Sequence, residues 1–201
     1  MDYFDYKDGH LKSEDIFITN ITKEVHTPFY CYSAKGLKTN FNILKDAFKD
    51  IDTKICYATK SNSNLSILKL LQEEGAGADV VSVGELKKSL IANIDPKNIV
   101  FSGVGKTSEE ISFEIKKKIL LINAESLSEI KEINKIAKLK NKKVRIGIRL
   151  NPNTDAHTLS QISTGKKENK FGVNRNTFYE IINFCKKSKN IDLKCLSVHI
   201  G

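Results

Sequence analysis

The sequence contains no long apolar run. A membrane-spanning helix needs about 20 consecutive, mostly apolar residues, and no stretch of these 201 residues approaches that length. The first ten residues carry several acids and lack the apolar segment of a secretory signal peptide. We therefore expect no membrane contact and a cytoplasmic location.

Spacings typical of metal sites are also lacking. The four cysteines form no Cys-x-x-Cys pair, and the four histidines show no ligand spacing. Cys31 and Cys56 lie within apolar, strand-like segments, where a reduced thiol behaves as a small core side chain. The sequence therefore predicts no metal site.

Arginine is scarce, although the chain is basic. Lysine and arginine together number 33 against 24 acids, which gives a net charge of +9. Such a balance raises the question of nucleic-acid binding. However, the lysines are spread along predicted helices, and aromatic residues do not alternate with basic ones. We interpret the charge as a solvated surface and predict no nucleic-acid partner.

Short apolar segments alternate with amphipathic segments from Thr27 onward, which is typical of a parallel sheet covered by helices. The pattern predicts strands at 29–32, 55–58, 78–82, 98–102, 119–123, 144–150 and 193–200. It predicts helices at 35–49, 65–74, 84–92, 108–117, 126–139 and 177–187.

Seven such units in a row favour an α/β fold of the (β/α)8 TIM-barrel type, which typically takes about 250 residues. An open, doubly wound sheet is the alternative. No Gly-x-Gly-x-x-Gly motif follows the first predicted strand, so a dinucleotide-binding site is not supported. No eighth strand is present, and we expect an incomplete barrel of about seven strands.

The first 26 residues differ from the rest. Residues 3–11 predict two short strands joined by an Asp8-Gly9 turn, and two short apolar segments follow at 16–18 and 21–25. We therefore expect two parts, a β arm at 1–26 that packs apart from the main body and a barrel at 27–201.

Four polar residues stand out where predicted strands end. Lys60 follows a strand predicted to be buried, Asp79 and Arg149 lie in later strands, and His199 lies near the end of the last. Each has an ordinary explanation: a surface lysine, a helix cap, a structural ion pair, a core histidine. Because the carboxyl ends of barrel strands meet at one mouth, all four together indicate a site. A lysine with a lowered pKa would be a nucleophile toward carbonyl compounds.

Seven motifs occur in an order that resembles the fold-type III pyridoxal-phosphate decarboxylases, and within them the diaminopimelate decarboxylases. Together they extend over nearly the whole chain. They are YATKSN at 57–62, GAGADVVSVGEL at 75–86, FSGVGKT at 101–107, INAES at 122–126, RLNP at 149–152, TG at 164–165 with KFG at 170–172, and VHIG at 198–201.

The resemblance implies a role for each site residue. Lys60 would bind the pyridoxal phosphate covalently and release it to the substrate amine, and His199 would stack on the pyridine ring. Asp79, Arg149 and Gly201 would belong to the cofactor site. In this family the cofactor accepts electrons as the bond to a carboxylate breaks. The reaction converts meso-diaminopimelate to L-lysine and CO2, the last step of lysine biosynthesis, and the full-length enzymes are homodimers.

The resemblance also implies a longer protein. The family's phosphate loop, the acid that pairs with the pyridine nitrogen, the cysteine proton donor and the substrate-binding arginine and tyrosine would all follow residue 201. We therefore expect the 201 residues alone to have little or no activity and to hold the cofactor poorly. The β arm would belong to a C-terminal β-domain beyond this chain.

Three alternatives remain open. One is a non-catalytic, single-barrel protein that binds pyridoxal phosphate. Another is a decarboxylase of ornithine, arginine or carboxynorspermidine. The third is an interaction module built from an incomplete barrel.

Overall fold

A computed structural model describes residues 3–154 and 171–200. Its first part is a three-stranded antiparallel sheet in the order β1-β2-β3, followed by a short helix. Asp8 and Gly9, with φ of 51° and 76°, connect β1 to β2 as a two-residue hairpin turn requires, so the predicted turn is confirmed. The segment at 21–25, expected as hairpin material, is mostly helical. The bounds are β1 Phe4–Lys7, β2 His10–Ser13, β3 Ile16–Phe17 and α1 Ile18–Glu24.

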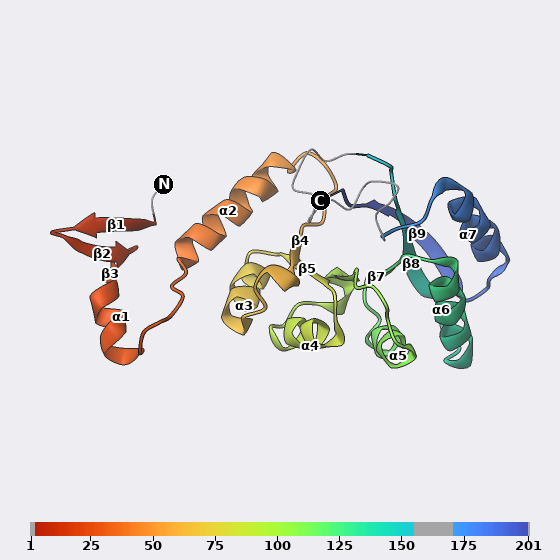
Figure 1. The fold of residues 1–201 in the computed structure, drawn as a ribbon, viewed down its shortest axis with the longest axis horizontal. Coiled ribbons are helices and arrows are strands. Elements are labelled where there is room, and N and C mark those ends of the chain that lie inside the picture. Colours follow the sequence, from red (N-terminus) through yellow and green to blue (C-terminus); the bar gives the residue numbers. More distant parts are fainter. Residues whose placement is uncertain (1–2, 155–170, 201) are drawn as a thin grey trace.

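This N-terminal sheet contacts the next helix, α2 (Ala34–Ala47), rather than the main sheet (Figure 1). Glu14 accepts hydrogen bonds from the Ser33 hydroxyl at 2.7 Å and the Lys35 amide at 2.9 Å. The Ser33 bond is the main reason that the Glu14 pKa is lowered. A Cβ on Gly36 would lie 2.9 Å from the Tyr3 ring, so glycine permits this close approach.

The main sheet has six parallel strands in the order β4-β5-β6-β7-β8-β9. The strands follow the chain without reversal, as in a barrel wall, whereas a doubly wound sheet changes direction at its middle. Helices α3 to α7 line one side of this wall (Figure 1). The strands are β4 Cys56–Ala58, β5 Gly77–Val80, β6 Ile99–Phe101, β7 Leu121–Ala124, β8 Val144–Leu150 and β9 Ile191–Val198. The helices are α3 Leu65–Glu73, α4 Val83–Ile91, α5 Ser108–Lys117, α6 Leu127–Leu139 and α7 Arg175–Lys187.

The first predicted strand, 29–32, is wrong, and the main sheet has six strands rather than seven. Residues 29–33 form no strand, Tyr30 is 90% exposed, and Ser33 already caps α2. The aromatic run looks like a strand because aromatic residues are enriched in strands. Here no neighbouring strand pairs with it, since β4 begins the sheet.

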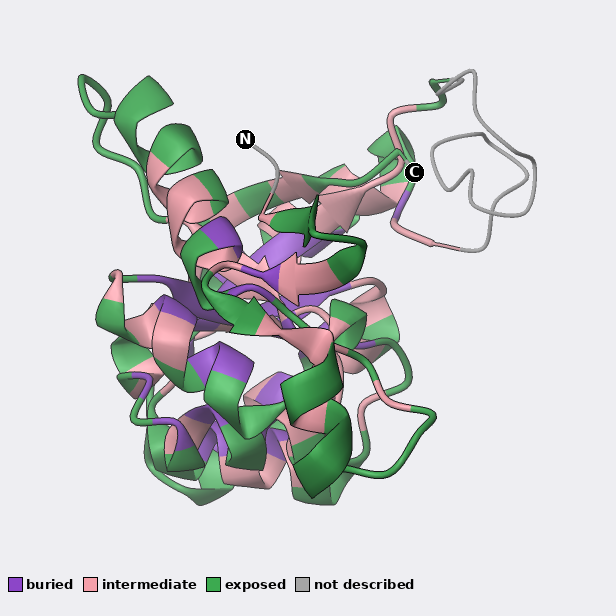
Figure 2. Ribbon diagram, turned by 90° about the vertical axis from the view of Figure 1, so that its left-hand side faces the viewer, coloured by how far each residue is buried: buried purple, intermediate pink, exposed green. Residues whose placement is uncertain are grey.

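Alternate strand residues divide the sheet into two faces. Residues such as Val80, Phe101, Ile122 and Ile148 are almost fully buried against the helices and form the core. Figure 2 shows the buried residues concentrated along the sheet and the inner sides of the helices. Because successive side chains alternate, the residues between them, including Asp79 and Asn123, point to the opposite, concave face.

Polar side chains cap the helices that follow the strands. Each capping oxygen accepts a backbone N–H from the first turn of its helix, which satisfies a donor that lacks an intrahelical partner. Thr107 and Glu110 add a reciprocal capping box at α5. These caps explain why the helix starts were predicted within one or two residues. The capping residues of α2 to α7 are Ser33, Asn64, Ser82, Thr107, Ser126 and Asn174.

In the described residues, no helix has the length and apolar character needed to cross a membrane. The same residues contain no group of three or more His, Cys, Asp or Glu side chains that could hold a metal ion.

A substitution at Gly77 tests how closely the strands of the main sheet pack. A Cβ there would lie 2.3 Å from the Asn98 carbonyl oxygen and 2.8 Å from the Cys56 sulfur. Gly77→Ala should therefore lower the free energy of unfolding by about 1–3 kcal/mol, measured in urea. The matched control is Gly84→Ala on α4, where the nearest atom is 3.7 Å away and alanine is the better helix former. Equal effects at both positions would contradict the steric argument.

Glu114 on α5 is fully buried, and neither of its carboxylate oxygens has a hydrogen-bond partner among the described residues. Burial raises its pKa from 4.5 to about 8, against the opposing charge of Lys106. The carboxyl group is therefore protonated in the folded protein at neutral pH. Between pH 4.5 and about 8 the unfolded chain loses this proton first, so the free energy of unfolding falls as pH rises through this window.

Glu114→Gln should remove this pH dependence, because an amide does not ionise. We expect the variant to gain at least about 1 kcal/mol over the wild type between pH 5 and pH 8, measured as the difference in free energy of unfolding in urea. The control is Glu109→Gln, an exposed position in the first turn of the same helix. Parallel pH curves for the wild type and Glu114→Gln would contradict the assignment.

Candidate functional site

Four predicted site residues lie at the carboxyl edge of the main sheet. Lys60 is in a single 3-10 turn, Thr59–Ser61, directly after β4. Asp79 pairs with Ala58 across β4 and β5. Arg149 lies near the end of β8, and His199 directly follows β9. The sequence reasoning therefore placed all four at the same edge correctly.

The four ionisable groups lie close enough to interact electrostatically. Burial raises the pKa of Asp79, and the Ser102 hydrogen bond together with the positive charges of Lys60, His199 and Arg149 opposes that rise. Burial also lowers the pKa of His199, assisted by Arg149 and Lys60 and opposed by Asp79. The structure thus gathers a lysine, an acid, an arginine and a histidine at one place.

Lys60 itself is exposed, and β4 is only half-buried. The sequence predicted a buried strand at this position. The difference arises because β4 is the first strand of the sheet and has only one neighbour, β5. The Lys60 amine therefore lies on an open turn where a small molecule can reach it.

Arg149 is held by Glu125, a partner that the sequence reasoning did not assign. Arg149 Nη1 donates to Glu125 Oε1 at 2.7 Å, and both side chains are at most 15% exposed. Glu125 Oε2 accepts the Gly172 amide at 3.3 Å, and the guanidinium lies 5.1 Å from the centre of the Phe171 ring. The ordinary explanation of Arg149 as part of an ion pair is therefore correct. The sequence did hold one signal for Glu125, namely its position. Glu125 follows the end of β7 just as Lys60 follows the end of β4.

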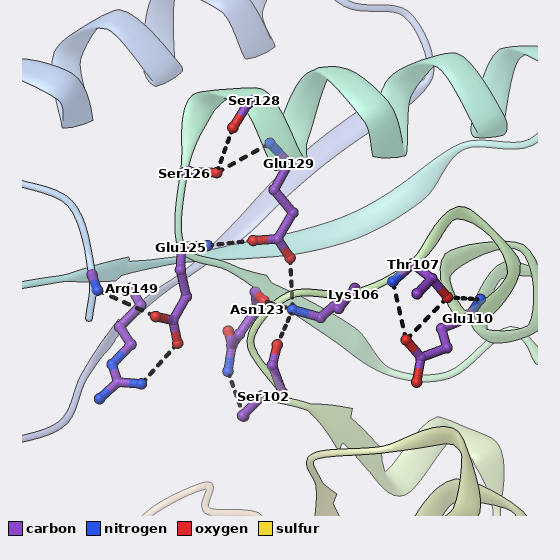
Figure 3. Close-up of polar contacts among 12 residues, drawn as sticks. Ser102, Lys106, Thr107, Glu110, Asn123, Glu125, Ser126, Ser128, Glu129 and Arg149 are labelled. Carbon is purple, nitrogen blue, oxygen red and sulfur yellow. Dashed lines mark hydrogen bonds and ion pairs between the residues drawn. The ribbon is translucent and has the colours of Figure 1, made fainter. Parts of the chain in front are cut away.

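Lys106, in the loop after β6, is the most buried cation of this edge. Its side chain is 0% exposed, and Nζ donates to the Gly103 carbonyl at 2.5 Å, the Asn123 carbonyl at 2.6 Å and Glu129 Oε1 at 2.6 Å (Figure 3). The second Glu129 oxygen accepts the amide of Glu125. Lys106 therefore fixes the loop after β6 to β7 and α6, and all three of its donors are used.

Replacing Lys106 tests this anchor. Lys106→Met keeps most of the stem but leaves Glu129 as an unpaired, mostly buried charge, so the free energy of unfolding should fall by about 3–5 kcal/mol. The control is Lys135→Met, because Lys135 is 68% exposed in its pair with Glu132. That change should cost less than about 1 kcal/mol. Urea titration of both variants measures the contrast, and equal losses would contradict it.

A row of hydrogen bonds crosses the concave face beside Asp79. Ser102 Oγ donates to Asp79 Oδ1 at 2.6 Å. Asn123 Nδ2 in turn donates to Ser102 Oγ at 3.1 Å, as Figure 3 shows. Both partners come from neighbouring strand ends, those of β6 and β7. In the sequence, Ser102 and Asn123 belong to the FSGVGKT and INAES motifs, but no role was predicted for either.

A hollow of about 810 Å³ lies at the opposite edge of the sheet. Its lining includes Lys54, Asn98, Lys143 and Arg145, which precede or begin their strands. In parallel barrels the reactive groups gather at the carboxyl ends instead. Side-chain chemistry therefore favours the edge that carries Lys60, despite the hollow at the other edge.

Some predicted positions lie outside the described residues. Gly201 is one, and so are Thr164, Gly165 and Lys170 of the predicted motifs.

Residues 35–201 match the family model described as "Pyridoxal-dependent decarboxylase, pyridoxal binding domain". The chain belongs to this family. The match confirms the expectation of a pyridoxal-dependent decarboxylase domain, and the cofactor that this domain binds is pyridoxal phosphate.

Curated and solved relatives agree with the match. Over 175 residues the chain is 50% identical to the diaminopimelate decarboxylase of Helicobacter pylori strain J99, covering 87% of this chain and 43% of that protein. A crystal structure of the Helicobacter pylori enzyme complexed with L-lysine has a TM-score of 0.89 at 47% identity, covering 92% of this chain and 47% of that one.

A more distant structure, the M. jannaschii enzyme in complex with L-lysine, has a TM-score of 0.90 at 35% identity and covers 98% of this chain and 48% of that one. These likenesses confirm the predicted fold class, an incomplete α/β barrel. The chain spans less than half the length of the relatives it matches.

Proposed function

We propose that this chain is the cofactor-holding part of an enzyme that decarboxylates meso-diaminopimelate to L-lysine and CO2. The observation that carries the proposal is the placement of Lys60 on an open turn, within electrostatic reach of Asp79, Arg149 and His199. The diaminopimelate decarboxylases among the relatives, some of them solved with L-lysine, support the substrate.

The residues at this edge fit pyridoxal phosphate. The cofactor offers an aldehyde to an amine, and Lys60 carries an exposed amine. It also offers a flat aromatic ring, and His199 carries a flat imidazole whose pKa is lowered mainly by burial. When bound, the cofactor supplies a sink for the electrons of the broken bond.

The chain's own side chains would bind and orient this group. Lys60 would hold the cofactor through its amine, which is a nucleophile toward carbonyl compounds. Asp79 balances positive charge at the edge, and Arg149 is fixed in direction by Glu125. We also assign Gly201 to the cofactor site, from its place in the VHIG motif.

The same proposal extends to organisation. We infer a β arm at residues 1–26 and a cofactor-binding barrel part at 27–201, and a homodimer as the working form of the whole enzyme. The separate three-stranded sheet of the arm supports the boundary.

Covalent trapping tests the assignment of Lys60. The purified chain is mixed with pyridoxal phosphate, reduced with borohydride, digested and analysed by mass spectrometry. We expect the label at Lys60, well above the other lysines, because this exposed amine lies within electrostatic reach of Asp79, Arg149 and His199. Lys60→Arg should abolish the selective label, and Lys97→Arg, an exposed lysine at the opposite edge, should leave it unchanged. Labels scattered over many lysines would overturn the assignment.

Substrate choice has a separate test. Meso-diaminopimelate, ornithine and arginine are titrated into the cofactor-loaded full-length enzyme that contains this chain, and the absorbance of the bound cofactor is followed. A response at the lowest concentration of meso-diaminopimelate supports the proposal. A stronger response to ornithine or arginine would favour another decarboxylase of the group. No response to any amino acid would favour a non-catalytic cofactor-binding protein.

A further inference from the structure

The Asp79 carboxylate has a single hydrogen-bond donor among the described residues, the Ser102 hydroxyl at 2.6 Å. Asp79 lies between Ala78 and Val80, both fully buried against the helices, so its side chain must point to the concave face. Four other titratable or charged groups act on this carboxylate: Cys56, Lys60, Arg149 and His199.

The direction of the Ser102 bond is fixed by a second bond. A hydroxyl has one proton to donate. Because Asn123 Nδ2 already donates to Ser102 Oγ at 3.1 Å, an Oγ lone pair is occupied and the hydroxyl proton is free for Asp79 Oδ1. The two hydrogen bonds therefore have the same direction: the Asn123 amide donates to the Ser102 hydroxyl, and the hydroxyl donates to the Asp79 carboxylate.

Gly147 in β8 leaves space for the Asn123 side chain. Asn123 Oδ1 is buried and accepts no hydrogen bond from the described residues. A Cβ on Gly147 would lie 2.2 Å from this oxygen, so any larger residue would displace the amide. Leaving a buried oxygen without a partner is unfavourable. Turning the amide over would not remove the problem, because it would bury the Nδ2 donors there instead.

We propose that Asn123 and Ser102 are positioning residues that hold the Asp79 carboxylate in one orientation, with Oδ2 left to face the amine and imidazole of the site. Asn123 acts only through Ser102, and Ser102 acts by donating its proton. The proposal rests on the proposed function for its purpose, but its geometry stands without the cofactor.

The test is the titration of Asp79, followed by carbon-13 NMR of the aspartate carboxyl carbons in the full 201-residue chain. The Asp79 signal is assigned by its loss in Asp79→Asn. Removing a hydrogen bond to a charged group disfavours that group's ionised form. Ser102→Ala should therefore raise the titration midpoint of Asp79 by about one pH unit.

Two further variants separate positioning from packing. Ser102→Thr keeps a hydroxyl and should restore the wild-type midpoint. Asn123→Ala should raise the midpoint by a smaller amount, because the hydroxyl is then free to rotate. The double variant Ser102→Ala with Asn123→Ala should shift no further than Ser102→Ala alone, as expected for groups that act in series.

The matched control is Ser197→Ala. Ser197 pairs with Arg149 across β8 and β9 and thus shares its face, but its hydroxyl makes no hydrogen bond with the described residues. This variant should leave the Asp79 midpoint unchanged. Thermal unfolding of every variant shows which proteins are folded. If an alanine variant does not fold, the midpoint of Ser102→Thr is compared with that of the wild type instead.

Three results would overturn the proposal: an unchanged midpoint in Ser102→Ala, an equal shift in Ser102→Thr, or additive shifts in the double variant. The outcome is independent of the cofactor. If the midpoints shift as expected but Lys60 is not labelled by pyridoxal phosphate, the positioning stands and the proposed function fails. If Lys60 is labelled but the midpoints do not shift, only the positioning fails.

Discussion

The parallel pairing of β4 to β9 in chain order is the constraint on which the rest of the structure depends. Parallel strands put all their carboxyl ends at one edge, so residues more than 100 positions apart in the chain, such as Lys60 and His199, come together there. Strand alternation then sorts the side chains between an apolar core and a concave polar face. The core is supplied by residues such as Val80 and Ile122, and the polar face by their neighbours Asp79 and Asn123.

The polar edge is kept in place by charges that are buried and paired. Lys106 has three acceptors and no exposed surface, and its partner Glu129 also binds the amide of Glu125. Glu125 in turn holds Arg149 and the amide of Gly172. A buried charge is tolerated only when its hydrogen bonds are complete. This network therefore sets the shape of the edge, while the Lys60 side chain stays exposed.

Glu114 shows the opposite solution to burying a charge. It has no donor among the described residues, and its pKa of about 8 means that it remains a neutral acid at neutral pH. Asp79 lies between these extremes, since burial raises its pKa while Ser102 and nearby cations oppose the rise. The same carboxyl chemistry thus yields an ion-pair partner, a neutral core group and a partly buried acid at the carboxyl edge of the sheet, depending on the donors within reach.

The sequence by itself determined the fold class, the helix starts to within two residues, and the placement of Lys60, Asp79, Arg149 and His199 at one edge of the sheet, because strand periodicity and capping residues are local signals. It failed at residues 29–32, where apolar and aromatic content looks like a strand but no neighbouring strand pairs with it. Only the tertiary structure showed that Glu125 holds Arg149, that Lys106 is buried, and that Asn123 reaches Asp79 through Ser102. Those contacts join residues more than 15 positions apart. They depend on strand register and on the space left by Gly147, which no local pattern encodes.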